Sequence, residues 1–559
     1  MTDLPTSESR TAETVHTGTP RFRDAWLFVM PTLFVLSTIV GAFRWFSPVP
    51  FWDMWEHTVR FYSDILDGRW SAFLDQANEH RILISYLLFW MDYRLFGGVT
   101  VFLIAVNVAL MAALWLCLYA AARSLLGGHQ RTLIVSCALL VIPCFSWLQS
   151  ENINWAFQSQ FYLAYLLPLA SMIFLARWME DTRSHKHYVW ALGCAVLASF
   201  TMANGLFALP LFIAMLVMGG SGTWRRTAAA TAAMIVTFAA WSYHYGVVHH
   251  PIAPIKRIVE FLLIFLGGPI GLIFHSLLAG LIAGTAVLGA CAFLAAHWLR
   301  GRVRQPMYLA LLFFVAYVCA AGLAASIGRS QYGLDTALSG RYETPVLLLY
   351  SALFLMFVYL HRDRSATVPV ICAVSVFTPL LMLTTQLDAV GTMGPDVARL
   401  RMQAALALNA GIDDRGAIAR IYPQDDAIHV DLIHQIAASA IQHDISVFSL
   451  HTLKMARAAQ GKSAQTLDIA QCLGHVDTMN TLPNDNQHVR LAGWAFDAKR
   501  RQVPEIAFIV SNGTVIGSVL TGIDRPDVRD QIDKKARRAG FDGYSTIVDQ
   551  GTMSVWCPS

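Results

Sequence analysis

The sequence predicts a polytopic α-helical membrane protein, with about eleven transmembrane helices and a small α+β, β-rich domain at its C-terminal end. Two observations predict the membrane part: 55% of the 559 residues are hydrophobic and only 14% are charged, whereas soluble proteins carry roughly 25% charged residues. A third observation predicts the domain, because residues 387–559 return to an ordinary soluble composition. The net charge of +4 is small and does not indicate nucleic-acid binding.

Apolar segments of about 20 residues are long enough to cross a bilayer. We identify eleven of them, at residues 25–45, 99–122, 132–148, 157–177, 188–204, 205–219, 227–246, 272–298, 306–326, 344–361 and 366–386. Two other apolar segments are shorter or interrupted. Residues 258–271 are broken by Gly267-Gly268-Pro269 and predict a re-entrant or interfacial helix, whereas residues 82–96 contain Asp92 and Arg94 and predict an amphipathic helix on the outer face.

Basic residues between the spans predict the orientation of the chain. If the N-terminus lies inside, every inner loop carries basic residues, such as Arg123 and Arg131 after the second span and Arg362 and Arg364 after the tenth. Inner loops of membrane proteins are enriched in Lys and Arg. We therefore expect four parts: a cytoplasmic tail (1–24), a transmembrane domain (25–390), an outer helical linker region (391–470) and an outer β-domain (471–559).

The C-terminal part shows two kinds of pattern. Ala-rich periodic stretches at 396–410 and 432–442 predict helices, whereas Val489–Phe496, Ile506–Val510 and Val515–Leu520 are strand-like, with the hairpin signal Asn512-Gly513 between the last two. Cys472 and Cys557 lie near the two ends of this β-rich stretch. In an oxidising compartment they would form a disulfide; two free thiols are the alternative, and the sequence leaves both open.

Charged residues are almost absent from the predicted span interiors, which argues against an ion-coupled transporter. They collect instead in the predicted outer loops. The first of these loops contains Trp52-Asp53-Met54-Trp55-Glu56 and Asn78-Glu79-His80-Arg81. Later outer loops add Glu151, Gln158, Arg329, Arg341 and Tyr342. Carboxylates and cations from separate loops are therefore expected to meet at one membrane face.

Such a cluster suits transfer of a sugar from an anionic, lipid-linked donor. A carboxylate can deprotonate the attacking hydroxyl, and guanidinium groups can hold the departing phosphate. We expect Asp53 to be the base and Glu151 to assist by orienting the acceptor. For the donor phosphate we expect Arg341, Arg329, Arg81 and His80, and for other substrate contacts Glu56, Glu79, Trp52, Trp55, Gln158 and Tyr342. For each of these residues a purely structural role is the alternative.

Three features resemble the GT-C superfamily of polytopic glycosyltransferases, over roughly residues 25–390. An acidic motif, Trp52-Asp53-Met54-Trp55-Glu56, follows the first span; Asn78-Glu79-His80-Arg81 leads through Tyr86 to Leu95-Phe96-Gly97; and Ser339-Gly340-Arg341-Tyr342-Glu343-Thr344-Pro345 enters a late span. The resemblance implies that Asp53 is catalytic, that Glu151 assists and that Arg341 contacts phosphate. Many members have Pro after the His of the second motif, so the role of Arg81 stays open.

The C-terminal stretch has a resemblance of its own. Leu491-Ala492-Gly493-Trp494-Ala495-Phe496-Asp497, Asp524-Arg525-Pro526-Asp527-Val528 and Ala539-Gly540-Phe541 are similar to a β-domain found in bacterial saccharide-modifying proteins. We expect Trp494 to be a packing residue, with saccharide binding as the alternative.

Together these resemblances imply a bacterial inner-membrane glycosyltransferase with a cytoplasmic N-terminus and a periplasmic C-terminal domain. It would move a sugar from a polyprenyl-phosphate carrier to a hydroxyl of a surface glycan such as O-antigen or lipopolysaccharide, with inversion. The expected partners are the lipid-linked sugar, the glycan acceptor and the bilayer, and no nucleic acid. No cofactor or metal is expected, although a weak divalent-cation site stays open. The alternatives are a transporter or flippase of lipid-linked sugars, a non-catalytic scaffold, and a polymerase or ligase of diphosphate-linked oligosaccharides.

Overall fold

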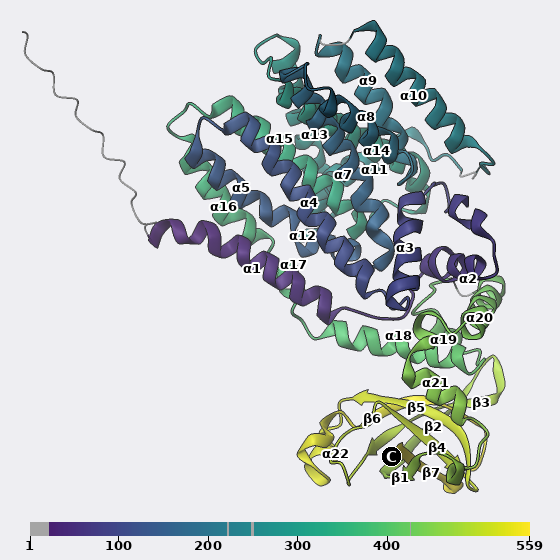
Figure 1. Ribbon diagram of the computed structural model, residues 1–559. Helices are drawn as coiled ribbons and strands as arrows, with labels where there is room; N and C mark the ends of the chain where they lie inside the picture. Colours follow the sequence, from purple (N-terminus) through teal and green to yellow (C-terminus); the bar gives the residue numbers. More distant parts are fainter. Residues whose placement is uncertain (1–21, 221–222, 248–250, 425) are drawn as a thin grey trace, which may run out of the picture.

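The computed structural model of the protein describes residues 22–220, 223–247, 251–424 and 426–559. The expected cytoplasmic tail comprises residues 1–24. Of these, residues 1–21 lie outside the described residues. A large helical body is followed by a layer of shorter helices and then by a β-sheet domain (Figure 1). The layer lies between the body and the sheet, so the three parts follow one another in space as they do in sequence.

Within the described residues, seven helices are long and apolar enough to cross a membrane, and the chain is a multi-pass membrane protein. These helices cover Leu27–Arg44, Val101–Leu126, Gln130–Asn154, Ala156–Glu180, Leu277–Leu299, Pro306–Tyr332 and Gly340–His361. Their main helices are α1 (Phe22–Arg44), α4 (Val101–Leu126), α5 (Gln130–Cys144), α7 (Ser159–Glu180), α13 (Leu277–Leu299), α14 (Pro306–Arg329) and α15 (Glu343–His361). The other four predicted spans are also helical, as α8 (His185–Ala198), α9 (Ala208–Met218), α10 (Trp224–Ser242) and α16 (Thr367–Leu381). The presence of a helix in each predicted span is confirmed, and the number of crossings stays a prediction.

Two pairs of segments that the sequence places at the same membrane face contact each other. At the predicted outer end, the Tyr245 hydroxyl donates a hydrogen bond to the Glu79 carbonyl over 3.3 Å. At the predicted inner end, the Gln305 amide donates to the Glu180 carboxylate over 3.2 Å. Each of these two contacts joins segments that are predicted to lie at the same end of the body. Which end faces the cytoplasm stays a prediction.

The interrupted segment 258–271 forms two helices, α11 (Ile255–Leu266) and α12 (Gly268–Ile273), that meet at Gly267. A side chain at Gly267 would place its Cβ 1.9 Å from the carbonyl oxygen of Gly280 on α13. The break therefore lies where two helix backbones approach closely, which only glycine permits. The helical character predicted for residues 82–96 is confirmed as well, by α3 (Leu83–Phe96).

Residues 391–470 form a packed layer that we call the collar. It consists of α18 (Met393–Asn409), α19 (Arg415–Ile418), α20 (Ala427–Gln442) and α21 (His451–Ala459), and it follows the short helix α17 (Leu383–Asp388). Both helices predicted from the Ala-rich stretches are present, as α18 and α20. On the side of the sheet, Asp414 of the collar accepts a 2.7 Å hydrogen bond from the Tyr544 hydroxyl. On the other side, α20 packs against the first outer loop.

Residues 426–559 contain one seven-stranded antiparallel sheet, with strand order β1-β7-β4-β5-β6-β3-β2. Its strands are β1 (Ile469–Gln471), β2 (Leu473–Leu482), β3 (Asp485–Phe496), β4 (Ile506–Ser511), β5 (Thr514–Ile523), β6 (Gly540–Thr546) and β7 (Met553–Pro558). The predicted β4–β5 hairpin is confirmed. Asn512 and Gly513 have φ values of 50° and 74°, and a two-residue type I′ turn requires positive φ at both positions.

The motifs of the β-domain have structural roles. Trp494 packs with Phe496 and Val528 in a small apolar cluster. Arg525 forms ion pairs with Asp477 at 2.6 Å and Asp527 at 2.7 Å, which fix the start of the short helix α22 (Pro526–Gln531). These contacts favour packing over saccharide binding as the role of Trp494.

The structure joins Cys472 to Cys557 by a disulfide between the β1–β2 junction and β7, with a Cα–Cα distance of 5.7 Å. The bond closes a loop with a sequence separation of 85 residues. A disulfide that closes so long a loop lowers the conformational entropy of the unfolded chain. Replacing both cysteines by serine is therefore expected to destabilise the β-domain by about 2–4 kcal/mol. Alkylation with and without reductant, read by mass spectrometry, checks the bond. Equal alkylation of both cysteines without reductant would contradict it.

Candidate functional site

A cavity of about 400 Å³ lies where the predicted outer loops meet the collar. Its wall combines the first outer loop, the start of α7, the turn before α9, the end of α14 and the segment before α15. Of the twelve predicted site residues, eight line it: Trp52, Asp53, Glu79, His80, Gln158, Arg329, Arg341 and Tyr342. Residues far apart in the sequence therefore form one chemical site.

Asp53 is held by an unusual local backbone. The preceding residue, Trp52, has a φ of 50°, a left-handed conformation that is unfavourable for a bulky side chain. Its backbone N–H donates a 2.7 Å hydrogen bond to the carbonyl of Ile421 in the collar, and its ring stacks on Trp155. A π-helical turn, residues Trp55–Arg60, begins two residues after Asp53. Such turns occur often at functional sites, and here the His57 N–H of the turn donates a 2.9 Å hydrogen bond to the Asp53 carbonyl.

The Asp53 carboxylate is partly buried and faces the cavity. In the part of the chain that the structure describes, it has neither a hydrogen-bond partner nor an ion pair. Burial raises the pKa of Asp53 to about 6, opposed by the Arg341 and Arg329 guanidinium groups and supported by the Glu56 and Glu79 carboxylates. Asp53 is therefore ionised at neutral pH and free to accept a proton, which are the properties of a general base.

Glu79 and Arg329 form an ion pair across the cavity wall, between Glu79 Oε1 and Arg329 Nη2. Burial works against ionisation of Glu79, but the charge of the Arg329 guanidinium and its hydrogen bond favour it, and the pKa of this carboxyl group is lowered. Glu79 is thus ionised and forms an ion pair with Arg329. It is placed to hold the guanidinium in position and not to act as a base.

His80 presents a neutral ring to the cavity. Its Nδ1 accepts a 3.2 Å hydrogen bond from the backbone N–H of Ala203, and burial lowers the pKa of the imidazole. In a neutral ring with Nδ1 as the acceptor, Nε2 carries the proton. His80 can therefore donate a hydrogen bond to an anion without adding positive charge.

Arg341 is positioned by Glu151. The Glu151 Oε2 atom accepts hydrogen bonds from the Arg341 backbone N–H at 3.0 Å and the Ser339 hydroxyl at 2.9 Å, and its Oε1 lies 3.9 Å from Arg341 Nε. Within the described residues, that buried Nε makes no hydrogen bond. Glu151 therefore fixes the segment that carries Arg341, and the guanidinium keeps free donors for a ligand.

The structure does not bring four predicted residues into the cavity wall. One of them, Glu151, lies behind Arg341, which it positions. Arg81 donates hydrogen bonds to three backbone carbonyl groups and lines a separate cavity of about 380 Å³. Trp55 is fully buried and packs against Phe448 of the collar. Glu56 accepts a 2.9 Å hydrogen bond from the Tyr422 hydroxyl, which ties the collar to the acidic motif.

The polar lining residues that the sequence analysis did not predict include Asn204 and Gln424. Asn204 lies in the tight connection between α8 and α9, and Gln424 comes from the collar. Asn204 interrupts a long apolar stretch, a signal that could have indicated it. No sequence signal connects Gln424 with a site formed mainly by residues far earlier in the chain.

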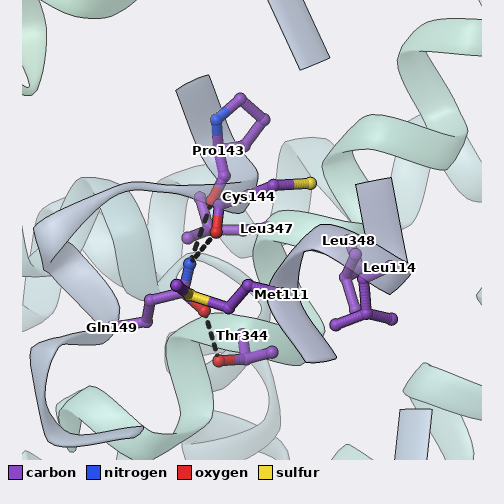
Figure 2. Close-up of a pocket in the computed structure, with 8 residues that line it drawn as sticks. All are labelled: Met111, Leu114, Pro143, Cys144, Gln149, Thr344, Leu347 and Leu348. Carbon is purple, nitrogen blue, oxygen red and sulfur yellow. Dashed lines mark hydrogen bonds between the residues drawn. The ribbon is translucent and has the colours of Figure 1, made fainter. Parts of the chain in front are cut away.

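Among the described residues, no group of three or more His, Cys, Asp or Glu side chains lies close enough together to hold a metal ion. That the site works without a metal stays a prediction. A different, apolar void of about 10 Å³ lies beside Gln149. Figure 2 shows the Gln149 amide donating to the carbonyls of Pro143 and Cys144 and accepting from the Thr344 hydroxyl.

Comparison with models of known protein families finds no match, and a search of curated proteins finds none either. Among solved structures, the crystal structure of the Archaeoglobus fulgidus oligosaccharyltransferase in complex with Zn and sulfate is similar to this chain, with a TM-score of 0.43 and 14% sequence identity. The match covers 69% of this chain and 55% of that one, so this chain spans about half the length of that protein.

Proposed function

We propose that the chain is a GT-C type glycosyltransferase that moves a sugar from a polyprenyl-phosphate carrier to a hydroxyl of a surface glycan. One observation carries this proposal: the unpaired Asp53 carboxylate and the Arg341 guanidinium, with its free donors, line the same cavity at one end of a membrane-spanning body. A base and a cation in one cavity are what attack of a hydroxyl on a phosphate-activated sugar requires. We place the reaction at the periplasmic face of a bacterial inner membrane, with O-antigen or lipopolysaccharide as the acceptor.

The reaction is a direct displacement. The acceptor oxygen attacks the anomeric carbon of the sugar, and Asp53 takes the hydroxyl proton. The bond between the anomeric carbon and the phosphate oxygen breaks, and its electron pair stays on polyprenyl phosphate. A single attack from the side opposite the leaving group inverts the anomeric centre.

The cations stabilise the charge that develops on the phosphate. Arg341 offers the free donors of a planar guanidinium, which suits phosphate oxygens. Arg329, held by Glu79, adds positive charge near the site, and the His80 Nε2–H adds a neutral donor. In this scheme Glu151 acts through Arg341 and not on the acceptor.

The rate of transfer is expected to rise with pH and to level off above about 6. Asp53 accepts a proton only when ionised, and burial raises the pKa of its carboxyl group to about 6. Below that pH the rate constant kcat/KM should fall about tenfold per pH unit, because the fraction of ionised base falls in proportion. A kcat/KM profile between pH 4.5 and 8 checks this, and a flat profile across that range would contradict Asp53 as the base.

The proposal is tested with the purified full-length protein in proteoliposomes. The donors are polyprenyl-phosphate sugars labelled in the sugar, and the acceptor is surface glycan from a strain that lacks the gene. A glycosyltransferase releases polyprenyl phosphate and labels the glycan. A flippase moves the label across the membrane with the sugar–phosphate bond intact, and a scaffold does neither. Transport without cleavage would overturn the proposal.

A further inference from the structure

Three side-chain amides line the same cavity with hydrogen-bonding atoms unused. Gln158 is fully buried, and in the described part of the chain neither its Nε2 nor its Oε1 has a partner. Gln160 is 4% exposed, and its Oε1 likewise has none. Asn204 donates through Nδ2 to the Tyr317 hydroxyl at 3.2 Å, but its buried Oδ1 accepts nothing from the described residues.

Buried amides without partners are costly, and native proteins rarely keep them. Gln149, a few residues earlier in the chain, shows the ordinary arrangement: its amide nitrogen and oxygen are both hydrogen-bonded within the protein (Figure 2). Gln158 differs from Gln149 in lining a cavity large enough for a ligand. Its unused donor and acceptor therefore point to a ligand that supplies the missing hydrogen bonds.

The lining indicates the chemistry of that ligand. A sugar hydroxyl can donate to the free oxygen of each amide and accept from the free nitrogen of Gln158, so hydroxyl groups suit these side chains. Trp52 and Trp155 stack on each other at 6.2 Å in the same wall and offer an apolar surface to the C–H face of a sugar ring. Amides beside aromatic rings suit a neutral ring that bears several hydroxyl groups.

The charges in the cavity lead to the same class of sugar. Arg329 is paired with Glu79, and Arg341 is needed for the donor phosphate. Among the described lining residues, no further cation is left for a sugar carboxylate. An amino sugar would require a carboxylate, but Glu79 is occupied by Arg329 and Asp53 must stay free to accept a proton.

We propose that Gln158, Gln160 and Asn204 form the pocket for the sugar of the donor, and that this pocket selects a neutral, hydroxyl-bearing sugar. The inference rests on the proposed function, because it places the phosphate of the same donor at Arg341. It goes beyond that function in naming the class of sugar and the residues that choose it.

Binding experiments separate the two proposals. The full-length protein in detergent is titrated with bare polyprenyl phosphate and with polyprenyl phosphate carrying glucose, galactose, mannose, glucosamine or glucuronic acid, and binding is measured by isothermal titration calorimetry. We expect at least one neutral sugar to tighten binding about tenfold over the bare carrier, as two or three added hydrogen bonds would. The two charged sugars should tighten it less. The variant Q158L should lose the gain from the neutral sugar and bind the bare carrier as the wild type does.

Each result decides one proposal. If bare polyprenyl phosphate does not bind, the proposed function fails. If it binds but no neutral sugar adds affinity, or a charged sugar adds more, the sugar-pocket inference fails and the proposed function stands. If Q158L does not fold, Q160L replaces it, with the same expected loss.

Thermal unfolding distinguishes a ligand-binding amide from a structural one. Without ligand, Q158L should unfold at the wild-type temperature or above it, because leucine removes two unpaired polar atoms. The matched control Q149L should unfold at a lower temperature, because it leaves two carbonyl groups and a hydroxyl without their partner. An equal loss of stability in both variants would make Gln158 a structural residue and overturn the inference.

Discussion

Replacing Asp53 by asparagine is expected to lower the rate of sugar transfer by about a hundred- to ten-thousandfold, the usual contribution of a general base. The amide keeps the size of the side chain and cannot accept the proton. Binding of the lipid-linked donor should be little changed, because the phosphate is held by the cations. The measurement is the turnover number with saturating donor and acceptor.

Loss of activity in D53N should not reflect unfolding. An acid whose pKa is raised by folding destabilises the folded state when it is ionised; for Asp53, with a pKa of about 6, this cost is fully present above pH 6 and absent below its unfolded value. The neutral amide removes the cost, so D53N should be at least as stable as the wild type at pH 7.

The matched control for D53N is D67N. Asp67 is an exposed aspartate of the same outer loop, with an ion pair to His443 at 3.1 Å. Its replacement should leave transfer within about threefold of the wild type, as is usual for surface positions. If D53N kept more than a tenth of the wild-type rate while D67N behaved normally, Asp53 would not be the base.

Replacing Arg341 by glutamine should have the second largest effect, a loss of about a hundred- to a thousandfold in kcat, comparable with removal of one oxyanion-stabilising donor. The charge on the phosphate grows as the sugar leaves, so the transition state gains more from Arg341 than the bound donor does. Lysine at this position should recover part of the rate, because it restores the charge without the planar fork of donors. Steady-state kinetics of R341Q and R341K check both expectations.

The control for Arg341 is R69Q, which removes a surface guanidinium of the first outer loop that pairs with Asp64 and Asp75. Exposed ion pairs contribute little, so R69Q should transfer sugar at close to the wild-type rate. An unchanged kcat in R341Q, with only a raised KM, would assign Arg341 to donor binding alone.

The sequence predicted the helices of the membrane body well, because hydrophobicity is a local signal. It also predicted that Asp53, Glu79, Arg329 and Arg341 belong to one site, because loops on the same membrane face must meet. The β4–β5 hairpin followed from Asn512-Gly513 alone. These are cases in which residue type and spacing determine the structure.

Other roles depend on contacts that sequence patterns do not reveal. Trp52 and Trp55 are three residues apart, yet only Trp52 lines the cavity, because Phe448 of the collar covers Trp55. Arg81 is held by carbonyl groups about 160 residues away. The sequence predicts the collar only as a helical linker region, but the hydrogen bond from the Trp52 N–H to the Ile421 carbonyl and the position of Gln424 in the cavity wall make it part of the site.

The most direct measurement is the surface-glycan composition of a strain that lacks the gene, complemented with the wild type, D53N or D67N at expression matched by immunoblot. The wild type and D67N should restore one missing sugar, and D53N should not. That result would support transfer by Asp53 at the periplasmic face and would identify the sugar. Full restoration by D53N would contradict the account and favour transport or scaffolding.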